Sequence, residues 1–192
     1  MGHSKIISVS LLLAVSAWCK PPACGCRMNF SAPAVNGGVF VLRGRQHRPV
    51  LLAFLELTAD DHQATSRATA VILQSLDHQY SGRGLRVAAV DATAVVSHRS
   101  SRHANLVNTA ANWNLELPVL EDPAGRAAQC FQIRSLPTIL LISPNGKELG
   151  RWEGFTRTPV LARAIEQTLG GPLASLPITS LRPENAPDPQ PK

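Results

Sequence analysis

One stretch constrains the fold of this chain more than any other, and it runs from Gln132 to Trp152. Within it, Pro137 opens an apolar, β-rich run from Thr138 to Ile142. A proline is allowed at the first residue of a strand because it need not donate a hydrogen bond there. Asn145-Gly146 then predicts a tight hairpin turn with two positive-φ positions. A return strand is expected from about Glu148 to Phe155.

The segments on either side of this hairpin alternate between helix and strand patterns. After it, Thr158-Pro159 begins a helix that runs to Leu169 and ends at Gly170-Gly171. Before it, the nearly continuous apolar run Val50 to Leu57 is typical of a strand covered on both faces. A helix from about His62 to Tyr80 carries one apolar stripe, formed by Ala68, Val71, Ile72, Leu76 and Tyr80.

The remaining elements are shorter. We expect, in chain order, a strand at Val39 to Leu42, a strand at Arg86 to Ala92, a helix ending near Trp113, an extended piece at Pro118 to Glu121 and a short helix at Gly125 to Phe131. Strands that alternate with helices predict an α/β domain, with a parallel sheet extended by the final hairpin.

The order proline, strand, Asn-Gly, strand, helix resembles the C-terminal half of a thioredoxin-like fold. The tract from Pro118 to Thr138 (PVLEDP through FQIRSLPT) is most similar to the redoxin/TlpA-ResA-like branch, and the resemblance covers Val35 to Leu169. It implies a central mixed sheet flanked by helices. It also implies that Pro137 is cis and faces a redox dithiol, and that Leu136, Pro137 and Thr138 bind an extended segment of a client protein.

The dithiol itself is missing. The resemblance places the two cysteines of the Cys-x-x-Cys motif at Ala59 and His62, and the preceding tryptophan at Thr58. A register shift cannot restore them, because no cysteine occurs from Met28 through Gln129. In the family, a helix N-terminus lowers the thiol pKa there and the second cysteine resolves the mixed disulfide. We therefore expect this site to be redox-inactive.

Two interpretations remain open for Asp60-Asp61-His62, which stands where the dithiol belongs. Acids in the first turn of a helix favour its dipole, so capping is the expected role. A metal or acid–base site is the alternative. His78, His98 and His103 have no motif spacing and are expected at the surface.

The four cysteines lie at positions 19, 24, 26 and 130. None has zinc-ligand spacing, and no metal or cofactor is expected. Cys24, Cys26 and Cys130 are the possible alternative thiols. Cys130 is expected to be a partly buried small residue. A disulfide to the N-terminal arm and a reactive thiol are the alternatives for it.

The N-terminus has the pattern of an export signal. Lys5 precedes the apolar run Ile6 to Val15, which is too short to span a bilayer, and a small-residue cleavage site follows at Val15-Ser16-Ala17. Lipid attachment at Cys19 and an uncleaved leader are alternatives. We thus expect a signal peptide at 1–17, a Cys/Pro-rich linker at 18–34, the domain at 35–170 and a disordered Pro-rich tail at 171–192.

The formal net charge is +6 and the pI is about 9.7. Basic residues are spread along the chain with no run longer than two, so nucleic-acid binding is not expected and the surface is interpreted as unspecialised. Export predicts a periplasmic or secreted location, with membrane contact only through a lipid on Cys19.

Three functions remain open at this point. The first is an exported thioredoxin-like protein that has lost thiol–disulfide exchange at the usual site and acts as a binding module. The second is a thiol–disulfide oxidoreductase or peroxiredoxin-like antioxidant that uses Cys24, Cys26 or Cys130. The third is an envelope-anchored structural protein.

Overall fold

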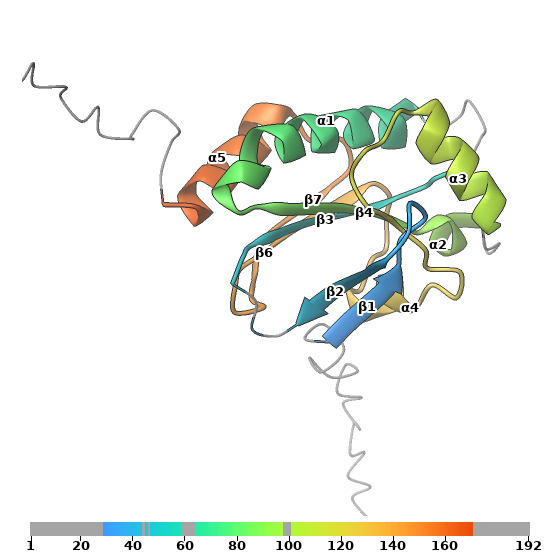
Figure 1. Cartoon of the computed structure of the whole chain (residues 1–192), viewed down its shortest axis with the longest axis horizontal. Helices are drawn as coiled ribbons and strands as arrows, with labels where there is room; N and C mark the ends of the chain where they lie inside the picture. The colour runs from blue at the N-terminus through green and yellow to red at the C-terminus, as the bar shows by residue number, and fades with distance from the viewer. Residues whose placement is uncertain (1–28, 44, 46, 59–63, 98–100, 171–192) are drawn as a thin grey trace, which may run out of the picture.

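The structure, a computed structural model, describes residues 29–43, 45, 47–58, 64–97 and 101–170. Its centre is a five-stranded mixed sheet with the strand order β5-β4-β3-β6-β7 (Figure 1). The strands are β3 (Val50–Leu55), β4 (Arg86–Asp91), β5 (Val119–Leu120), β6 (Thr138–Ile142) and β7 (Glu148–Glu153). β4 runs parallel to both β3 and β5, whereas β6 is antiparallel to β3 and β7. The expected thioredoxin-like α/β architecture is confirmed.

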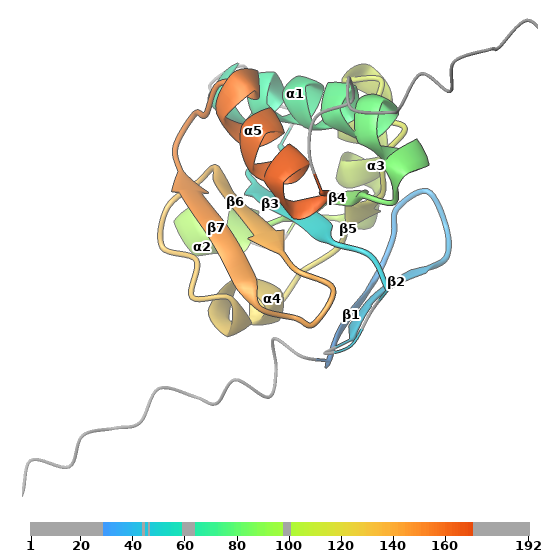
Figure 2. The same cartoon turned by 90° about the vertical axis from the view of Figure 1, so that its left-hand side faces the viewer.

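Each face of the sheet is covered by its own layer (Figures 1 and 2). On one face lie α1 (Ala64–Tyr80), α3 (His103–Asn112) and α5 (Thr158–Thr168), which share an apolar core with alternate residues of β3. The other face packs against a two-stranded hairpin and α4 (Arg126–Cys130). All residues of β3 and β6 are buried, as their continuous apolar runs predict.

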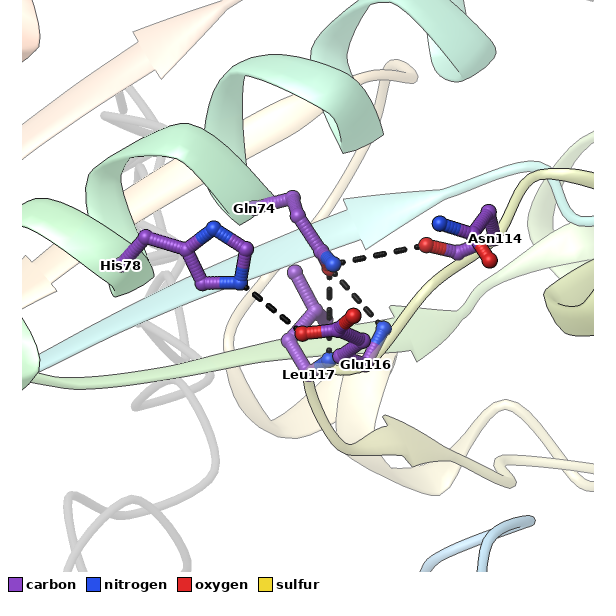
Figure 3. Close-up of polar contacts among 5 residues, drawn as sticks. All are labelled: Gln74, His78, Asn114, Glu116 and Leu117. Carbon is purple, nitrogen blue, oxygen red and sulfur yellow. Dashed lines mark hydrogen bonds and ion pairs between the residues drawn. The ribbon is translucent and has the colours of Figure 1, made fainter.

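The layer of helices is joined by hydrogen bonds between side chains. The hydroxyl of the fully buried Tyr80, the last residue of α1, donates to Glu166 Oε1 of α5 at 3.0 Å. Gln74 of α1 reaches the connection between α3 and β5, where its Oε1 accepts from the backbone N–H of Glu116 at 3.0 Å and its Nε2 donates to the Asn114 carbonyl at 3.4 Å (Figure 3). Beside it, His78 Nε2 lies 3.0 Å from Glu116 Oε2 at the surface, where the sequence placed this histidine.

The boundary of the expected linker at 18–34 needs a correction. Asn29–Pro33 forms β1, which pairs antiparallel with β2 (Val39–Arg43), and the hairpin continues to the sheet through a bridge between Ala34 and Leu120. The domain therefore begins within the segment assigned to the linker. The alternation of β1 extends only over Phe30 to Pro33, which is too short to be recognised beside a Cys/Pro-rich stretch.

The turn between β6 and β7 also differs from the expectation. Only Gly146 has a positive φ, of 80°, whereas Asn145 does not. The N–H of Gly146 donates to the Ser143 carbonyl at 2.9 Å, and Pro144 occupies the second position of the turn. A proline fixes φ near −65°, which favours a type I turn followed by a left-handed glycine over a two-residue loop with two positive-φ residues.

One arginine side chain connects the edge strand β7 to the residue that follows α4. Arg151 donates from Nε and Nη2 to the carboxylate of Glu148, at 2.9 and 3.0 Å, and from Nη2 to the Phe131 carbonyl at 2.9 Å. A register shift between Leu141 and Ile142 marks a bulge in β7. Bulges of this kind interrupt an exposed edge and discourage pairing with another chain.

Two further features of the helices differ from the prediction. The stretch after β4 forms a short helix, α2 (Thr93–Ser97), which no apolar stripe in the sequence indicates. In the described chain α1 begins at Ala64. Asp60, Asp61 and His62, which we expected to cap this helix, fall outside the described residues.

Candidate functional site

The candidate site lies at the edge of the sheet where β3, β4 and β7 end and β6 begins. The strand register places these ends together, since Phe54 pairs with Thr138 and Thr138 pairs with Glu153. Residues 56–58, which follow β3, and the helix α2 leave the sheet at this same edge (Figure 1). Exposed apolar side chains stand on two of the segments, namely Val96 on α2 at 45% and Phe155 after β7 at 52%.

The Leu136–Pro137 peptide bond at this edge is cis. Pro137 and Thr138 are buried, and Leu136 is half-buried. The Pro137 carbonyl accepts a hydrogen bond from the Gly154 N–H at 2.8 Å, which holds the segment carrying Phe155 against the proline. Within the described chain, the backbone of Leu136 makes no hydrogen bond. This arrangement leaves the Leu136 backbone close to the segment that carries the exposed Phe155.

A chain of buried hydrogen bonds, which we call the polar relay, joins the segments that end at this edge. The Leu57 N–H donates to Thr93 Oγ1 at 3.2 Å, and that hydroxyl donates to Asp91 Oδ1 at 2.5 Å. The Thr93 N–H donates to the same carboxylate oxygen at 3.2 Å. The relay ties the end of β3 to the start of α2, immediately before the segment 59–63. This relay was not predicted from the sequence. An acidic residue at the end of an otherwise apolar strand, here Asp91, is the pattern that indicates it.

Burial raises the pKa of Asp91 above 3.8, and the hydrogen bonds from Thr93 oppose the rise without cancelling it. A raised pKa in the folded state means that folding takes up a proton. The stabilising contribution of this group is therefore complete below its unfolded-state pKa and is lost as the pH rises through the folded-state pKa.

Replacement of Asp91 by Asn should make the protein more stable than the parent at neutral pH. The amide oxygen of the substituted side chain can still accept from Thr93, and no buried charge forms as the pH rises. The difference in the free energy of unfolding should shrink as the pH falls toward 4, by about 1.4 kcal/mol for each unit by which the pKa is raised. Urea unfolding at a series of pH values measures it. A difference that does not change with pH would contradict the assignment.

Several residues that the sequence analysis singled out lie outside the described residues. These are Ala59 and His62 at the family's cysteine positions, the neighbouring Asp60 and Asp61, His98, and the cysteines Cys19, Cys24 and Cys26. Their predicted roles stay predictions. The site edge does contain the predicted Leu136, Pro137 and Thr138. Cys130 lies elsewhere, on α4, which packs on the face of the sheet opposite to α1.

Cys130 is disulfide-bonded in the structure, and its bonding partner lies outside the described residues. It is therefore not the free, partly buried thiol that we expected first, although it is half-buried as predicted. It lines a groove of about 660 Å³ between β1, the loop after β5 and α4. The groove has mixed walls, with Phe30 and Ala127 on the apolar side and Asp122, Arg126 and Gln129 on the polar side.

Neither a metal centre nor a membrane span occurs within the described part of the chain. No group of three or more His, Cys, Asp or Glu side chains there could hold a metal ion. Likewise, no described helix is long and apolar enough to cross a bilayer.

Known proteins are similar to this chain in structure but not detectably in sequence. No family profile matches the chain, and no curated protein matches its sequence. Solved structures do match it. A putative thiol:disulfide interchange protein DsbE from Chlorobium tepidum has a TM-score of 0.63 at 24% identity, over 74% of this chain and 94% of that one.

Two further matches have the same character. The exposed lipoprotein thioredoxin Etrx1 of Streptococcus pneumoniae has a TM-score of 0.57 at 24% identity, over 74% of this chain and 98% of that one. A secreted disulfide oxidoreductase of Mycobacterium tuberculosis has a TM-score of 0.59 at 14% identity, over 72% of this chain and 96% of that one.

These likenesses define the class of the protein as thioredoxin-like in fold. Its structural neighbours are thiol–disulfide oxidoreductases that include DsbE-type proteins, which agrees with the resemblance to the redoxin/TlpA-ResA-like branch. At identities this low the comparisons establish the fold and leave the activity open.

Proposed function

We propose that this chain is an extracytoplasmic thioredoxin-fold protein that binds an extended protein segment at the edge formed by Leu136, Pro137 and Phe155. In this proposal it does not exchange disulfides at the position where the fold usually does so. The observation that carries the proposal is the combination of an intact proline edge with a chain that has no cysteine from Met28 through Gln129.

The contacts at the edge support binding of an extended segment. An unpaired backbone beside a strand can add main-chain hydrogen bonds to a partner, and an adjacent aromatic side chain supplies apolar contact area. Phe155 is held in place through the hydrogen bond from Gly154 to Pro137. Because this arrangement needs no thiol, it is compatible with loss of the dithiol.

An extracytoplasmic location is supported by the leader pattern of Lys5 and Ile6 to Val15. Two of the structural neighbours are described as secreted and as an exposed lipoprotein. A lipid on Cys19 stays the proposed variant of this location.

The substitution Phe155→Asp should weaken the binding of an unfolded polypeptide about tenfold. The reason is that the charged side chain removes an apolar contact at the proposed edge. The probe is a small disulfide protein that has been reduced and carboxymethylated, so that it stays extended and cannot exchange disulfides. Affinity is measured by fluorescence anisotropy for the parent, Phe155→Asp and Val39→Asp.

Val39 is the matched control, since it is 68% exposed and lies on the β1–β2 hairpin, away from the proline edge. Val39→Asp should bind the probe like the parent. Equal weakening by both variants, or no binding of the probe by the parent, would overturn the proposal.

A second function, thiol–disulfide exchange or peroxiredoxin-like chemistry through Cys130 with Cys24 or Cys26, is favoured by one observation. Cys130 is disulfide-bonded and half-buried beside a groove, so its sulfur is not sealed in the core. Titration in glutathione buffers with differential alkylation distinguishes the two. A potential below about −300 mV marks a structural disulfide, whereas opening near −200 mV would favour exchange.

A further inference from the structure

Basic residues from two separate parts of the sequence meet at the edge of the sheet opposite the candidate site. One group lies on the connection between β2 and β3, and the other lies between α1 and β4. Together they form what we name the basic edge, which consists of Arg43, Arg45, His47, Arg48, Arg83 and Arg86.

The backbone brings the two groups together. Arg86 pairs in register with Val50, the first residue of β3, and its N–H donates to the Pro49 carbonyl at 3.0 Å. A side-chain carbon added at Gly84 would lie 4.0 Å from Cγ of Arg48, so the Arg48 side chain runs beside the turn before β4. The basic edge is therefore built by the start of the parallel pair β3–β4.

Four of the arginines at this edge have no carboxylate partner within the described chain. Arg43, Arg45 and Arg48 are exposed and form no ion pair with any described carboxylate. Arg86 lies over the Phe40 ring at 4.3 Å and donates to the Val41 carbonyl, so it contacts no acid either. Burial, followed by the charge of Arg48, lowers the pKa of Arg86, as expected where like charges stand close together.

Two of the carboxylates at the same end of the sheet have other partners. Glu148, at the start of β7, holds Arg151, and Glu166 of α5 accepts from the Tyr80 hydroxyl. The basic edge therefore presents a local excess of positive charge to solvent, and such an excess attracts anionic surfaces.

The chain also enters the domain beside this edge. Asn29, the first residue of β1, pairs with Arg43, the last residue of β2. The sequence before Asn29 contains Cys19, ten residues away, and the apolar run Ile6 to Val15. Ten residues span at most about 35 Å. A membrane contact made at Cys19 would hold the basic edge within that distance of the bilayer, and one made by the apolar run, which ends 14 residues before Asn29, would hold it within about 50 Å.

We propose that the basic edge rests on the anionic headgroups of a lipid membrane. The described chain begins at Asn29 beside this edge, and the apolar run lies before Asn29 in the sequence, which favours a membrane over a soluble polyanion. No aromatic side chain is among the exposed large apolar residues described at this edge, although single-stranded nucleic acid would need such side chains for stacking. The candidate site, at the other ends of β3 and β4, then faces away from the membrane, where protein segments can reach it.

The test compares two triple variants of the full chain that remove the same charge. Arg43→Gln/Arg45→Gln/Arg48→Gln alters the basic edge, and Arg102→Gln/Arg134→Gln/Arg157→Gln alters exposed arginines near the candidate site. Co-sedimentation with vesicles of phosphatidylcholine, alone or with 30% phosphatidylglycerol as about the usual anionic fraction, measures binding. Binding to the neutral vesicles reports the contribution of the N-terminal apolar sequence.

The parent should bind the anionic vesicles more tightly than the neutral ones. The basic-edge variant should lose this preference by roughly 100-fold, since each basic residue near an anionic surface contributes about fivefold. The control variant should stay within about threefold of the parent, and added salt should weaken the parent most. Should the triple variant fail to fold, Arg43→Glu/Arg45→Glu carries the same expectation, because both side chains are exposed.

Three outcomes would overturn the proposal. The first is equal affinity of the parent for both kinds of vesicle. The second is an equal loss in the two triple variants, which would show that only net charge matters. The third is loss of binding to polyphosphate or duplex DNA with unchanged vesicle binding, which would assign the edge to a soluble polyanion. None of these results bears on the probe binding at Phe155, so the proposed function is tested separately.

Discussion

The double variant Ala59→Cys/His62→Cys should gain disulfide reductase activity of roughly 100-fold or more over the parent. The resemblance places the Cys-x-x-Cys pair at these two positions, just before α1. A helix N-terminus stabilises a thiolate through its unpaired N–H groups and its dipole, so a cysteine there becomes an effective nucleophile near neutral pH. A second cysteine three residues later can resolve the mixed disulfide. The measurement is the rate of insulin reduction with dithiothreitol as electron donor.

A matched control places the same two cysteines one residue out of register. Asp60→Cys/Gln63→Cys has the same number of thiols and the same spacing, but both are shifted by one residue from the family positions. It should stay within about tenfold of the parent, since the attacking thiol would no longer face the proline edge. If the two double variants were equally active, or if neither gained activity, the alignment of Ala59 and His62 with the dithiol would be wrong.

The second large effect concerns stability. Phe131→Ala should reduce the free energy of unfolding by about 3–5 kcal/mol, which is the usual cost of deleting a fully buried aromatic side chain. Phe131 is buried, and its ring lies 5.8 Å from that of Phe30 on β1 and 5.5 Å from that of Phe54 on β3. One side chain therefore joins the N-terminal hairpin, α4 and the central strand.

Thermal and urea unfolding measure this loss, with Phe155→Ala as the matched control. Phe155 is half-exposed, so its truncation should change stability by no more than about 0.5–1 kcal/mol. The melting temperature of Phe131→Ala should fall by roughly 10 °C or more. A similar small loss in both variants would mean that the hairpin does not depend on Phe131.

The elements predicted best are those with strong local signals. The strand Thr138–Ile142 has the predicted bounds, and α5 begins at the predicted Thr158. Both are set by contiguous residues: a proline before an apolar β-branched run, and a Thr-Pro start signal. The missing Cys-x-x-Cys is also a property of the sequence alone, because a thiol that is not encoded cannot be supplied by folding.

The features that were missed depend on contacts that a local hydrophobic pattern does not record. β1 is a strand because Phe30 and Ala32 have β2 and α4 to pack against, and α2 starts where Thr93 bonds to the carboxylate of Asp91. Asn145 has no positive φ because Pro144 selects a different turn. In each case a tertiary contact or a neighbouring residue outweighed a weak local preference.

The sequence by itself determined the order of the strands and helices other than β1 and α2, the proline edge and the absence of a Cys-x-x-Cys motif, because these follow from neighbouring residues and from the inventory of side chains. Only the tertiary structure decided that Arg48 lies beside the start of β4, and that Leu57, Thr93 and Asp91 form one relay. Arg48 and Gly84 are 36 residues apart in the sequence, as are Leu57 and Thr93, so their proximity exists only after the parallel strands β3 and β4 have paired. Closing such loops depends on the packing of the whole sheet, which no short stretch of sequence records.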